Sequence, residues 1–374
     1  MKPTIHQLRS YAISHSLFRP TTLRAAFERL GFVQADPIRA PARAHDLILR
    51  QRVKGYRAGE LERCYAALEL EEDYLYAYGF LTRDLWQLVH RRRTTDLPEF
   101  EKKVLKEVRR HGAMHPKQLA ELFGSERRTN NWGGYSRVTK LALEDLHERG
   151  LLRIAGRDKG VRIYAAAQLP SKPIAGRDRL RRLLLAIVNI LAPVSERTLR
   201  EAARPMRDLL ATFPAVLATL VGAGELQKQV IAGVSYVLPA QTKTHNAGPS
   251  VRFLAPFDPV VWDRRRFEHF WGWPYRFEAY TPKAKRLRGY YAMPLLWGEA
   301  VVGWANVGVV KGDLNVELGF IEKRPQEKLF DLELDDEIAR LKAFLDLKTA
   351  NDRLEIQTTK NLAALVSGST SIFP

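Results

Sequence analysis

The chain has 374 residues, with 60 Lys or Arg against 42 Asp or Glu, so its formal net charge is +18 and its isoelectric point is near 10.0. This length allows two or more domains, each with its own core, and the 45% of hydrophobic residues indicates a soluble globular protein. Such a positive surplus repels itself unless a polyanion offsets it. Nucleic acid is the usual polyanion, and a membrane surface is the weaker alternative.

Several other classes of protein are excluded or disfavoured. The longest apolar run, residues 183–194, is interrupted by Asn189 and falls short of the roughly 20 residues that span a bilayer. The N-terminus lacks the apolar core of a signal peptide, and the single cysteine, Cys64, rules out an internal disulfide and a cysteine zinc site. The nine histidines are scattered, and no phosphate-binding glycine loop is present. We expect a cytoplasmic, nucleoid-associated protein without membrane contact, metal or cofactor.

The most informative stretch lies near the N-terminus. Residues 5–30 hold two helical patterns, and the second ends at Gly31, followed by a short extended piece. Gln34 and Asp36 are two residues apart, so on an extended chain they point to the same side. Pro37 follows, and a helix is expected from Asp36 to about residue 53. Asp36 is then either the N-cap of that helix, with Gln34 a polar edge-strand residue, or half of a chemical pair with Gln34.

A repeated order of elements follows. Residues 101–165 hold three helical patterns and then two strands around a basic turn, and residues 181–238 repeat this order. In this repeated order, residues 150–153 and 224–227 both lie where the hairpin begins, and we expect residues 31–34 to be the matching position of a first copy. We therefore predict an α+β protein with three tandem winged-helix units, the first carrying an insertion at 54–100 with an aromatic and acidic run at 70–80.

The C-terminal part has a different pattern. Residues 241–250 have linker composition, and four strands are expected within 251–320, forming a small barrel or curled sheet. A last amphipathic helix covers 332–347, and the tail beyond 350 is expected to be partly disordered. The predicted domains are 1–100, 101–170 and 171–245 for the winged helices, 246–330 for the β-rich domain, and 331–374 for the helix and tail. The four expected strands are residues 275–280, 287–293, 300–309 and 315–320.

Basic residues near the Gln34 and Asp36 pair, in the predicted hairpin and among the aromatics of 262–291 are candidates for DNA contact. Lys and Arg neutralise phosphates, and aromatic faces can stack on bases. The alternative is that the aromatics fill the core of the β domain and only the charges are exposed. The candidate contacts are Arg39, Arg43, His45, Arg50, Arg153, Arg157, Lys159, Arg264, Arg265, Arg266, Arg276, Lys283, Lys285, Arg286 and Arg288.

Three separated segments carry a resemblance to a known family. The segment 34–38 with Arg43, His45 and Arg52, the segment 257–266, and the segment 289–294 together resemble the YcaQ/AlkZ family of bacterial DNA glycosylases, in its Gln-x-Asp form. The resemblance covers roughly residues 5–347. It implies three winged helices in a C-shaped arrangement, a β domain and a basic channel. It also implies excision of alkylated purines and unhooking of interstrand crosslinks, with Gln34 and Asp36 as the catalytic pair.

The implied chemistry suits these residues. A purine alkylated at N7 or N3 is already cationic, so it leaves without a general acid, and one carboxylate can suffice where ordinary glycosidases use two. No lysine lies beside the pair, which argues against Schiff-base lyase chemistry. The expected partner is double-stranded DNA with alkylated or crosslinked purines, bound by a monomer. Two alternative functions remain open, a non-enzymatic winged-helix regulator and an RNA-processing factor. The positive charge fits both, and the tandem winged helices fit the regulator equally well.

Overall fold

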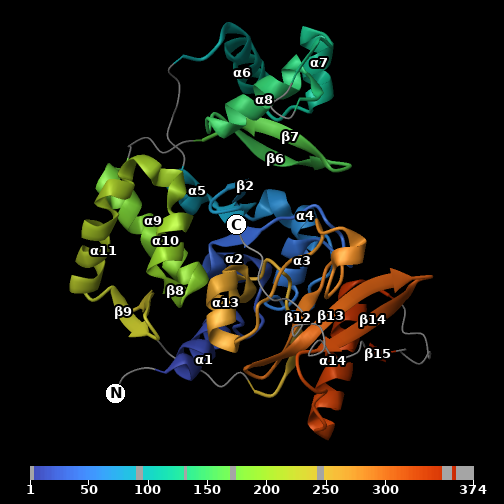
Figure 1. Cartoon of the computed structure of the whole chain (residues 1–374). Coiled ribbons are helices and arrows are strands. Elements are labelled where there is room, and N and C mark those ends of the chain that lie inside the picture. The colour runs from blue at the N-terminus through green and yellow to red at the C-terminus, as the bar shows by residue number, and fades with distance from the viewer. Residues whose placement is uncertain are drawn as a thin grey trace.

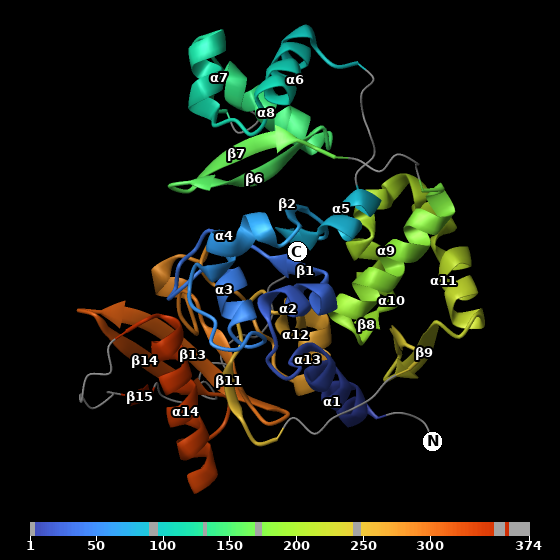
Figure 2. The ribbon, with the colours of Figure 1, turned by 180° about the vertical axis from the view of Figure 1, so that it is seen from behind.

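The structure is a computed structural model that describes residues 4–89, 96–129, 133–168, 174–241, 248–347 and 356–358. Helices and strands are mixed along the whole chain, as expected for an α+β protein. The unit with helices α6, α7 and α8 stands above the body of the molecule, helices α9–α11 lie at one side, and a sheet with helix α14 lies at the other (Figures 1 and 2).

The first unit surrounds a three-stranded antiparallel sheet in the order β1-β3-β2. Thr22 caps helix α2 by accepting the Ala25 N–H, and Gly31 ends it in a positive-φ conformation that suits glycine. The elements are α1 (Ile5–Ser16), α2 (Leu23–Leu30), β1 (Phe32–Gln34), α3 (Ala44–Leu49), α4 (Glu60–Cys64), η1 (Tyr65–Ala67), β2 (Leu70–Tyr74), β3 (Tyr78–Thr82) and α5 (Arg83–Val89).

Two predictions for this unit are wrong. No helix starts at Asp36: the chain is irregular until α3 begins at Ala44. Residues 70–82 are also not an insertion, because β2 and β3 complete the sheet that β1 begins. The pairing of β1 with β3 could not be predicted from the residue pattern of each segment taken alone.

The second unit has its own apolar core, which includes Val104, Leu119, Leu143 and Tyr164. Met114 forms an isolated antiparallel bridge with Tyr164 on the second strand of the hairpin. The elements are α6 (Glu99–His111), α7 (Pro116–Phe123), β4 (Arg127–Thr129), β5 (Tyr135–Arg137), α8 (Val138–Glu148), β6 (Leu152–Asp158) and β7 (Val161–Ala166).

The third unit repeats the sheet order of the first, as β8-β10-β9. The short strands β1 and β8 each pair with the last strand of the hairpin in their unit, and the Met114–Tyr164 bridge is the counterpart in the second unit. Residues 31–34 therefore correspond to β8, and their predicted match with 150–153 and 224–227 is wrong. The elements are α9 (Gly176–Leu191), β8 (Val194–Ser195), α10 (Glu196–Ala202), η2 (Arg204–Thr212), α11 (Phe213–Gly222), β9 (Leu226–Ile231) and β10 (Val234–Pro239).

The C-terminal part is a five-stranded sheet in the order β11-β12-β13-β14-β15, flanked by α14. The strands expected at 300–309 and 315–320 are present, whereas residues 275–280 form no strand and the strand expected at 287–293 begins only at Met293. Helices α12 and α13 were not predicted. The elements are β11 (Val251–Phe253), α12 (Pro259–Trp262), α13 (Arg264–Trp271), η3 (Lys283–Lys285), β12 (Met293–Trp297), β13 (Ala300–Val310), β14 (Asp313–Phe320), α14 (Lys328–Phe344) and β15 (Ile356–Thr358).

Shared cores join the first unit to the third unit and to the C-terminal part. One apolar cluster runs from Phe27 and Leu47 of the first unit to Phe253 and Phe330 of the C-terminal part. A second cluster joins helix α1 and the β3–α5 region to the helices of the third unit. The body that presents Gln34 and Asp36 is therefore packed from both sides, while the second unit keeps a separate core. The tail beyond 358 lies outside the described residues.

Candidate active site

The Gln34 and Asp36 pair lies where the chain leaves the first sheet. Gln34 is opposite Gly79 of β3, and the next residue, Ala35, still donates its N–H to the Tyr78 carbonyl oxygen at 2.9 Å. A side chain at Gly79 would clash with the Val33 carbonyl oxygen and the Phe32 ring. This close packing fixes the end of β1 and therefore the direction in which the following residues leave the sheet.

Asp36 closes a turn and is not the N-cap of a helix. Its Oδ1 accepts the Ile38 N–H at 2.9 Å, two residues along the chain. Burial raises the pKa of the Asp36 carboxyl group, and the Ile38 hydrogen bond opposes this only in part. At the N-cap position that the sequence offered, helix N–H groups and the helix dipole would have favoured the ionised form of Asp36. Because α3 begins at Ala44, that stabilisation is missing here.

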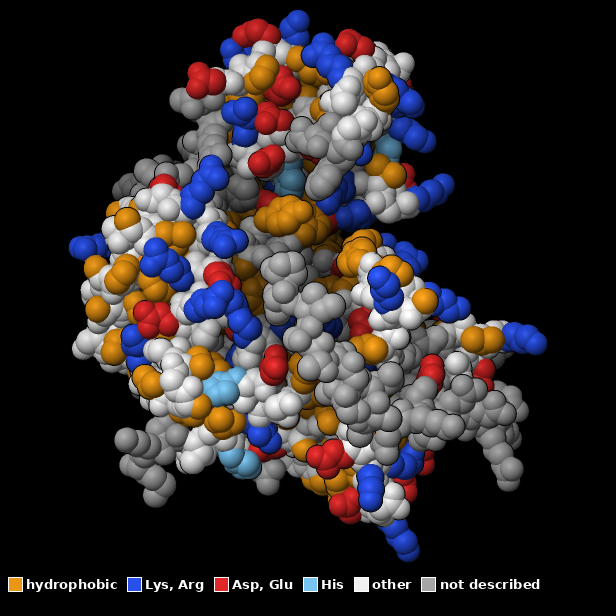
Figure 3. Space-filling view, in the orientation of Figure 1, with side chains coloured by type: hydrophobic (Ala, Val, Ile, Leu, Met, Phe, Trp, Pro, Cys, Tyr) orange, Lys and Arg blue, Asp and Glu red, His pale blue; other side chains and the backbone are white. Residues whose placement is uncertain are grey.

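Asp36 lines a cavity of about 680 Å³ between the first and second units. Its wall from the first unit includes Asp36, Arg43, His45 and Tyr78. Lys and Arg side chains border the notch between the second unit and the body below it (Figure 3). The wall from the second unit includes His115, Lys117, Arg137, Thr139, Lys140, Glu144, Arg157, Arg162 and Tyr164. A carboxylate therefore faces a largely cationic wall across the cavity.

Two polar groups near Asp36 have no hydrogen-bond partner among the described residues. One is Oε1 of Gln34, and the other is the hydroxyl of Tyr291, a buried residue in the turn before β12. Burial and the negative charge of Asp36 raise the pKa of Tyr291 well above its usual value, so this phenol stays protonated. Gln34 itself is not in the cavity wall. Its amide oxygen is buried beside the cavity residues Ala35 and Asp36, with its hydrogen-bonding capacity unused by the described residues.

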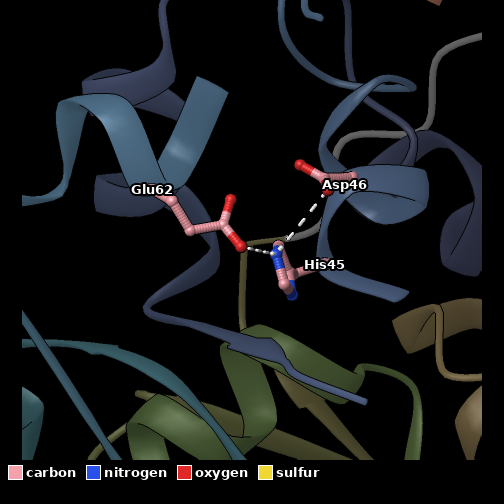
Figure 4. Close-up of side chains that lie close together, drawn as sticks. All are labelled: His45, Asp46 and Glu62. Atoms are coloured by element: carbon pink, nitrogen blue, oxygen red, sulfur yellow. Dashed lines mark hydrogen bonds and ion pairs between the residues drawn. The ribbon is translucent and has the colours of Figure 1, made fainter. Parts of the chain in front are cut away.

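Next to Asp36, a buried cluster holds the irregular segment before α3. His45 Nε2 lies 3.2 Å from Glu62 Oε1 and 3.8 Å from Asp46 Oδ2, between the two carboxylates (Figure 4). Burial raises the pKa of Glu62, but the hydrogen bond and charge of His45 together with Arg43 outweigh it and lower the pKa to about 2.

This cluster has the residue types of a metal site, since its three ligand atoms lie within 4.8 Å of one another. Other donors already occupy its carboxylates. The Arg43 guanidinium donates to Glu62, and Asp46 Oδ1 accepts the Tyr56 hydroxyl at 2.8 Å and the Gly59 N–H at 3.1 Å. A divalent cation would have to displace an arginine. The geometry therefore describes a hydrogen-bonded brace, in which Arg43 and His45 are fixed by protein carboxylates.

A row of ion pairs connects the second unit to the first. Arg153 Nε donates to Glu71 Oε2 at 2.8 Å, and Arg157 bonds to Glu72. Glu72 also accepts the Tyr78 hydroxyl at 2.6 Å and lies 3.6 Å from Arg162 Nε. Both glutamates are buried, so they are protected from screening by salt. The two hairpin arginines predicted to contact phosphate are thus bound to acidic residues of strand β2.

Four of the predicted DNA contacts are buried, and burial contradicts a direct role on the surface. His45 belongs to the brace, and Arg50 donates to the fully buried Glu337. Arg266 is 2% exposed and donates to backbone carbonyl groups of Leu191, Pro193, Pro259 and Val260. Arg288 is buried over the Trp273 ring and against Glu278. Arg264 is partly buried, stacks on Tyr275 and donates to the Val261 carbonyl oxygen.

The remaining predicted contacts lie at the surface. Arg265 is exposed but bonds to Glu201, and Arg286 is partly exposed beside the Tyr290 ring. Trp273 and Trp304 are buried and stacked on each other, which supports the interpretation that most aromatics of this region fill a core. Tyr280 and Tyr290 remain exposed. Five of the candidates are exposed and have no carboxylate partner within the described part of the chain: Arg39, Lys159, Arg276, Lys283 and Lys285.

Sequence reasoning missed the acidic residues that organise the site. Glu62, Glu71 and Glu72 received no role, although residues 70–80 had been noted as an acidic and aromatic run. Three consecutive acidic residues on a strand that is otherwise apolar were the available signal, because buried carboxylates need cationic partners. The hairpin arginines that pair with Glu71 and Glu72 lie about 80 residues away along the chain, in a different unit.

Comparison with known proteins identifies the class. A family model described as DNA glycosylase AlkZ-like matches residues 27–344, which is most of the chain. The protein is therefore a DNA glycosylase, a hydrolase that acts on N-glycosyl bonds in DNA. More specifically, the chain belongs to the AlkZ-like family, and the resemblance seen in the sequence is confirmed.

Among solved structures, the chain is similar to the Streptomyces sahachiroi DNA glycosylase AlkZ. The TM-score is 0.61 with 15% sequence identity, over 96% of this chain and 100% of that chain. At this identity the likeness shows a shared fold. Separately, no helix in the described part of the chain is both long and apolar enough to cross a membrane.

Proposed function

We propose that this chain hydrolyses the N-glycosidic bond of purines alkylated at N7 or N3 in double-stranded DNA and also unhooks interstrand crosslinks. The observation that carries the proposal is the position of Asp36 in the wall of the cavity between the first two units. An alkylated purine carries positive charge before the bond breaks, so it leaves as a neutral base without a general acid. A single carboxylate is then sufficient, and the first-unit wall offers Asp36 for that role.

In this proposal Asp36 acts on the sugar side of the bond. Positive charge grows on the deoxyribose as the base departs, and the Asp36 carboxylate stabilises it or takes a proton from the attacking water. Gln34 holds the water or the nucleotide through its amide, whose Oε1 has no partner among the residues that the structure describes. The lysines of the cavity wall, Lys117 and Lys140, belong to the second unit, across from Asp36. No Schiff base is part of this reaction, so the enzyme is monofunctional.

We further propose that the three units are winged helices and that the protein acts as a monomer, in the cytoplasm and associated with the nucleoid. The support is the common strand pairing, in which a short early strand pairs with the second hairpin strand in each unit. A cavity between two units can admit a bulky base without complete rotation into a closed pocket, which a crosslinked base could not achieve. The domain boundaries given above remain predictions.

The test is the release of free base. Duplex DNA treated with a methylating agent is incubated with the protein, and released 7-methylguanine and 3-methyladenine are quantified by chromatography and mass spectrometry. The proposal predicts release of both bases and none of unmodified guanine. A DNA-binding regulator would bind this duplex through its phosphates and release no base. The same assay on a defined N7-linked crosslink tests unhooking, read as separation of the strands on a denaturing gel.

A further inference from the structure

The second-unit wall of the cavity contains a buried hydroxyl that no described residue satisfies. Thr139 lines the cavity and is 2% exposed, yet its hydroxyl has no hydrogen-bond partner among the described residues. A buried hydroxyl without a partner costs free energy, roughly 1–3 kcal/mol in proteins. The unsatisfied Thr139 hydroxyl therefore lowers the stability of the free protein. This indicates that a bound ligand supplies its hydrogen-bond partner.

The position of Thr139 indicates an anionic partner. It is the second residue of helix α8, whose N-cap residue, Arg137, makes no side-chain capping bond. The Val138 amide donates to the Glu126 carbonyl oxygen at 2.9 Å, and the amides that follow it in the first turn have no acceptor within the helix. Exposed amides and the helix dipole together favour an anion at such an end.

The charges around this helix end point the same way. Arg137, Lys140 and Lys117 are exposed and line the cavity. Arg137 and Lys117 have no ion-pair partner among the described residues, and Lys140 has only Glu144 at 3.7 Å, an exposed pair of little strength. Apart from Asp36 and Glu144, the cavity wall has one more carboxylate, Glu72 of the first unit, which is held by Arg157, Arg162 and Tyr78.

We propose that Thr139, Lys140 and the first turn of α8 form a binding site for one phosphodiester of the DNA strand that carries the target nucleotide. This inference rests on the proposed function, which places the sugar of that nucleotide at Asp36 on the opposite wall. A nucleotide that spans the cavity then extends its own backbone phosphate toward α8. The second unit thereby positions the substrate, and the first unit supplies the carboxylate.

The test measures binding without turnover. Full-length protein is titrated by fluorescence anisotropy, at several salt concentrations, with a duplex containing one tetrahydrofuran abasic analogue, which has no glycosidic bond to cut. Thr139→Val and Lys140→Ala are each expected to weaken binding about 10-fold, and Lys140→Ala should lower the salt slope by about one. Lys106→Ala is the matched control, an exposed lysine of helix α6 that is outside the cavity, and should change affinity less than about 2-fold.

A second measurement separates a ligand role from a structural one. Because Thr139→Val removes an unpartnered hydroxyl at nearly constant volume, its thermal midpoint should equal or exceed that of the wild type. A neutral methylphosphonate at one phosphate beside the analogue should weaken wild-type binding about 10-fold and weaken Thr139→Val binding by a smaller factor, because Lys140 and the helix amides remain in that variant. The proposal is overturned if Lys140→Ala matches Lys106→Ala, or if Thr139→Val unfolds at a lower temperature and binds as wild type does. Absence of base release by the wild type would instead contradict the proposed function and leave these binding results valid.

Discussion

Arg52 of the first unit and Asp258 of the C-terminal part form a fully buried, two-pronged ion pair. Arg52 Nη1 lies 2.7 Å from Asp258 Oδ2, and Nη2 lies 2.9 Å from Oδ1. The guanidinium also donates to the Ser16 and Ile48 carbonyl oxygens and to the Ser16 hydroxyl, so its remaining hydrogens are satisfied. Both residues lie in segments that carry the family resemblance. Packing explains why Arg52 and Asp258 belong to these segments, because the pair holds the unit that presents Asp36 against the C-terminal sheet.

Breaking this pair should destabilise the fold. Asp258→Asn keeps the size of the side chain and leaves the Arg52 charge buried without a counter-charge, at an expected cost of about 3–5 kcal/mol in the free energy of unfolding. Urea unfolding followed by fluorescence measures it. The control is Asp346→Asn in the exposed pair with Arg57, 3.9 Å apart, where a change below about 1 kcal/mol is expected. Equal losses in the two variants would contradict the assigned role of Asp258.

Replacing Gln34 should separate chemistry from folding. Because Oε1 of Gln34 accepts no hydrogen bond from any described residue, the unfolding free energy of Gln34→Met should differ from the wild type by less than about 1 kcal/mol. If the amide holds water or nucleotide, single-turnover base release should fall at least about 10-fold. If Gln34→Met releases base at the normal rate, or loses base release and folding stability together, Gln34 only stabilises the end of strand β1.

The raised pKa of Asp36 predicts the pH dependence of excision. The proposed chemistry uses the ionised carboxylate, and burial makes that form harder to reach than in an exposed aspartate. As pH falls, kcat/KM should therefore decline with a midpoint above the ordinary value of 3.8, because this parameter reports the free enzyme. The measurement is kcat/KM for 7-methylguanine release across acidic pH, corrected for spontaneous depurination. A profile that stays flat below pH 3.8 would contradict the role of an ionised Asp36.

The ion pairs of strand β2 predict how firmly the second unit is attached. Glu72→Gln leaves Arg157 and Arg162 facing each other without a carboxylate, and we expect a loss of about 1–3 kcal/mol at this contact, less than for a fully buried pair. Hydrogen exchange should become faster in β2 and in the hairpin of β6 and β7. The control is Glu126→Gln, in the exposed pair with Arg128 of the same unit, which should exchange as the wild type does. Identical exchange in both variants would remove the attachment role from Glu72.

Local patterns in the sequence predicted much of the fold. The helix α8 at Val138–Glu148 and the hairpin of β9 and β10 follow from periodicity, glycine turns and helix caps, which are properties of neighbouring residues. The pairing of β1 with β3 was missed because it joins residues separated by about 45 positions, and the acidic run of β2 hid that strand among supposed insertion residues. Helix α13 was missed because its aromatics and arginines suggested a binding surface instead of a core.

The candidate site was predicted in part for the same physical reason. Gln34 and Asp36 are close in sequence, so their spacing alone predicted that they lie near each other at the end of a strand. Spacing could not show which arginines remain unpaired. Arg153 and Arg157 bond to carboxylates of another unit, and Arg266 bonds to a backbone carbonyl group of the third unit. A count of positive charge indicates a polyanionic partner, but only the folded chain shows which cations are already paired.

The most direct measurement of the central claim is single-turnover release of 7-methylguanine by Asp36→Asn, with duplex binding measured in parallel. Asparagine can still accept the Ile38 N–H, so binding and thermal stability should stay close to the wild type. The release rate should fall about 100-fold or more, because the charge that stabilises the developing cation is gone. Release within a few-fold of the wild-type rate, with binding intact, would contradict the assignment of Asp36 as the catalytic carboxylate.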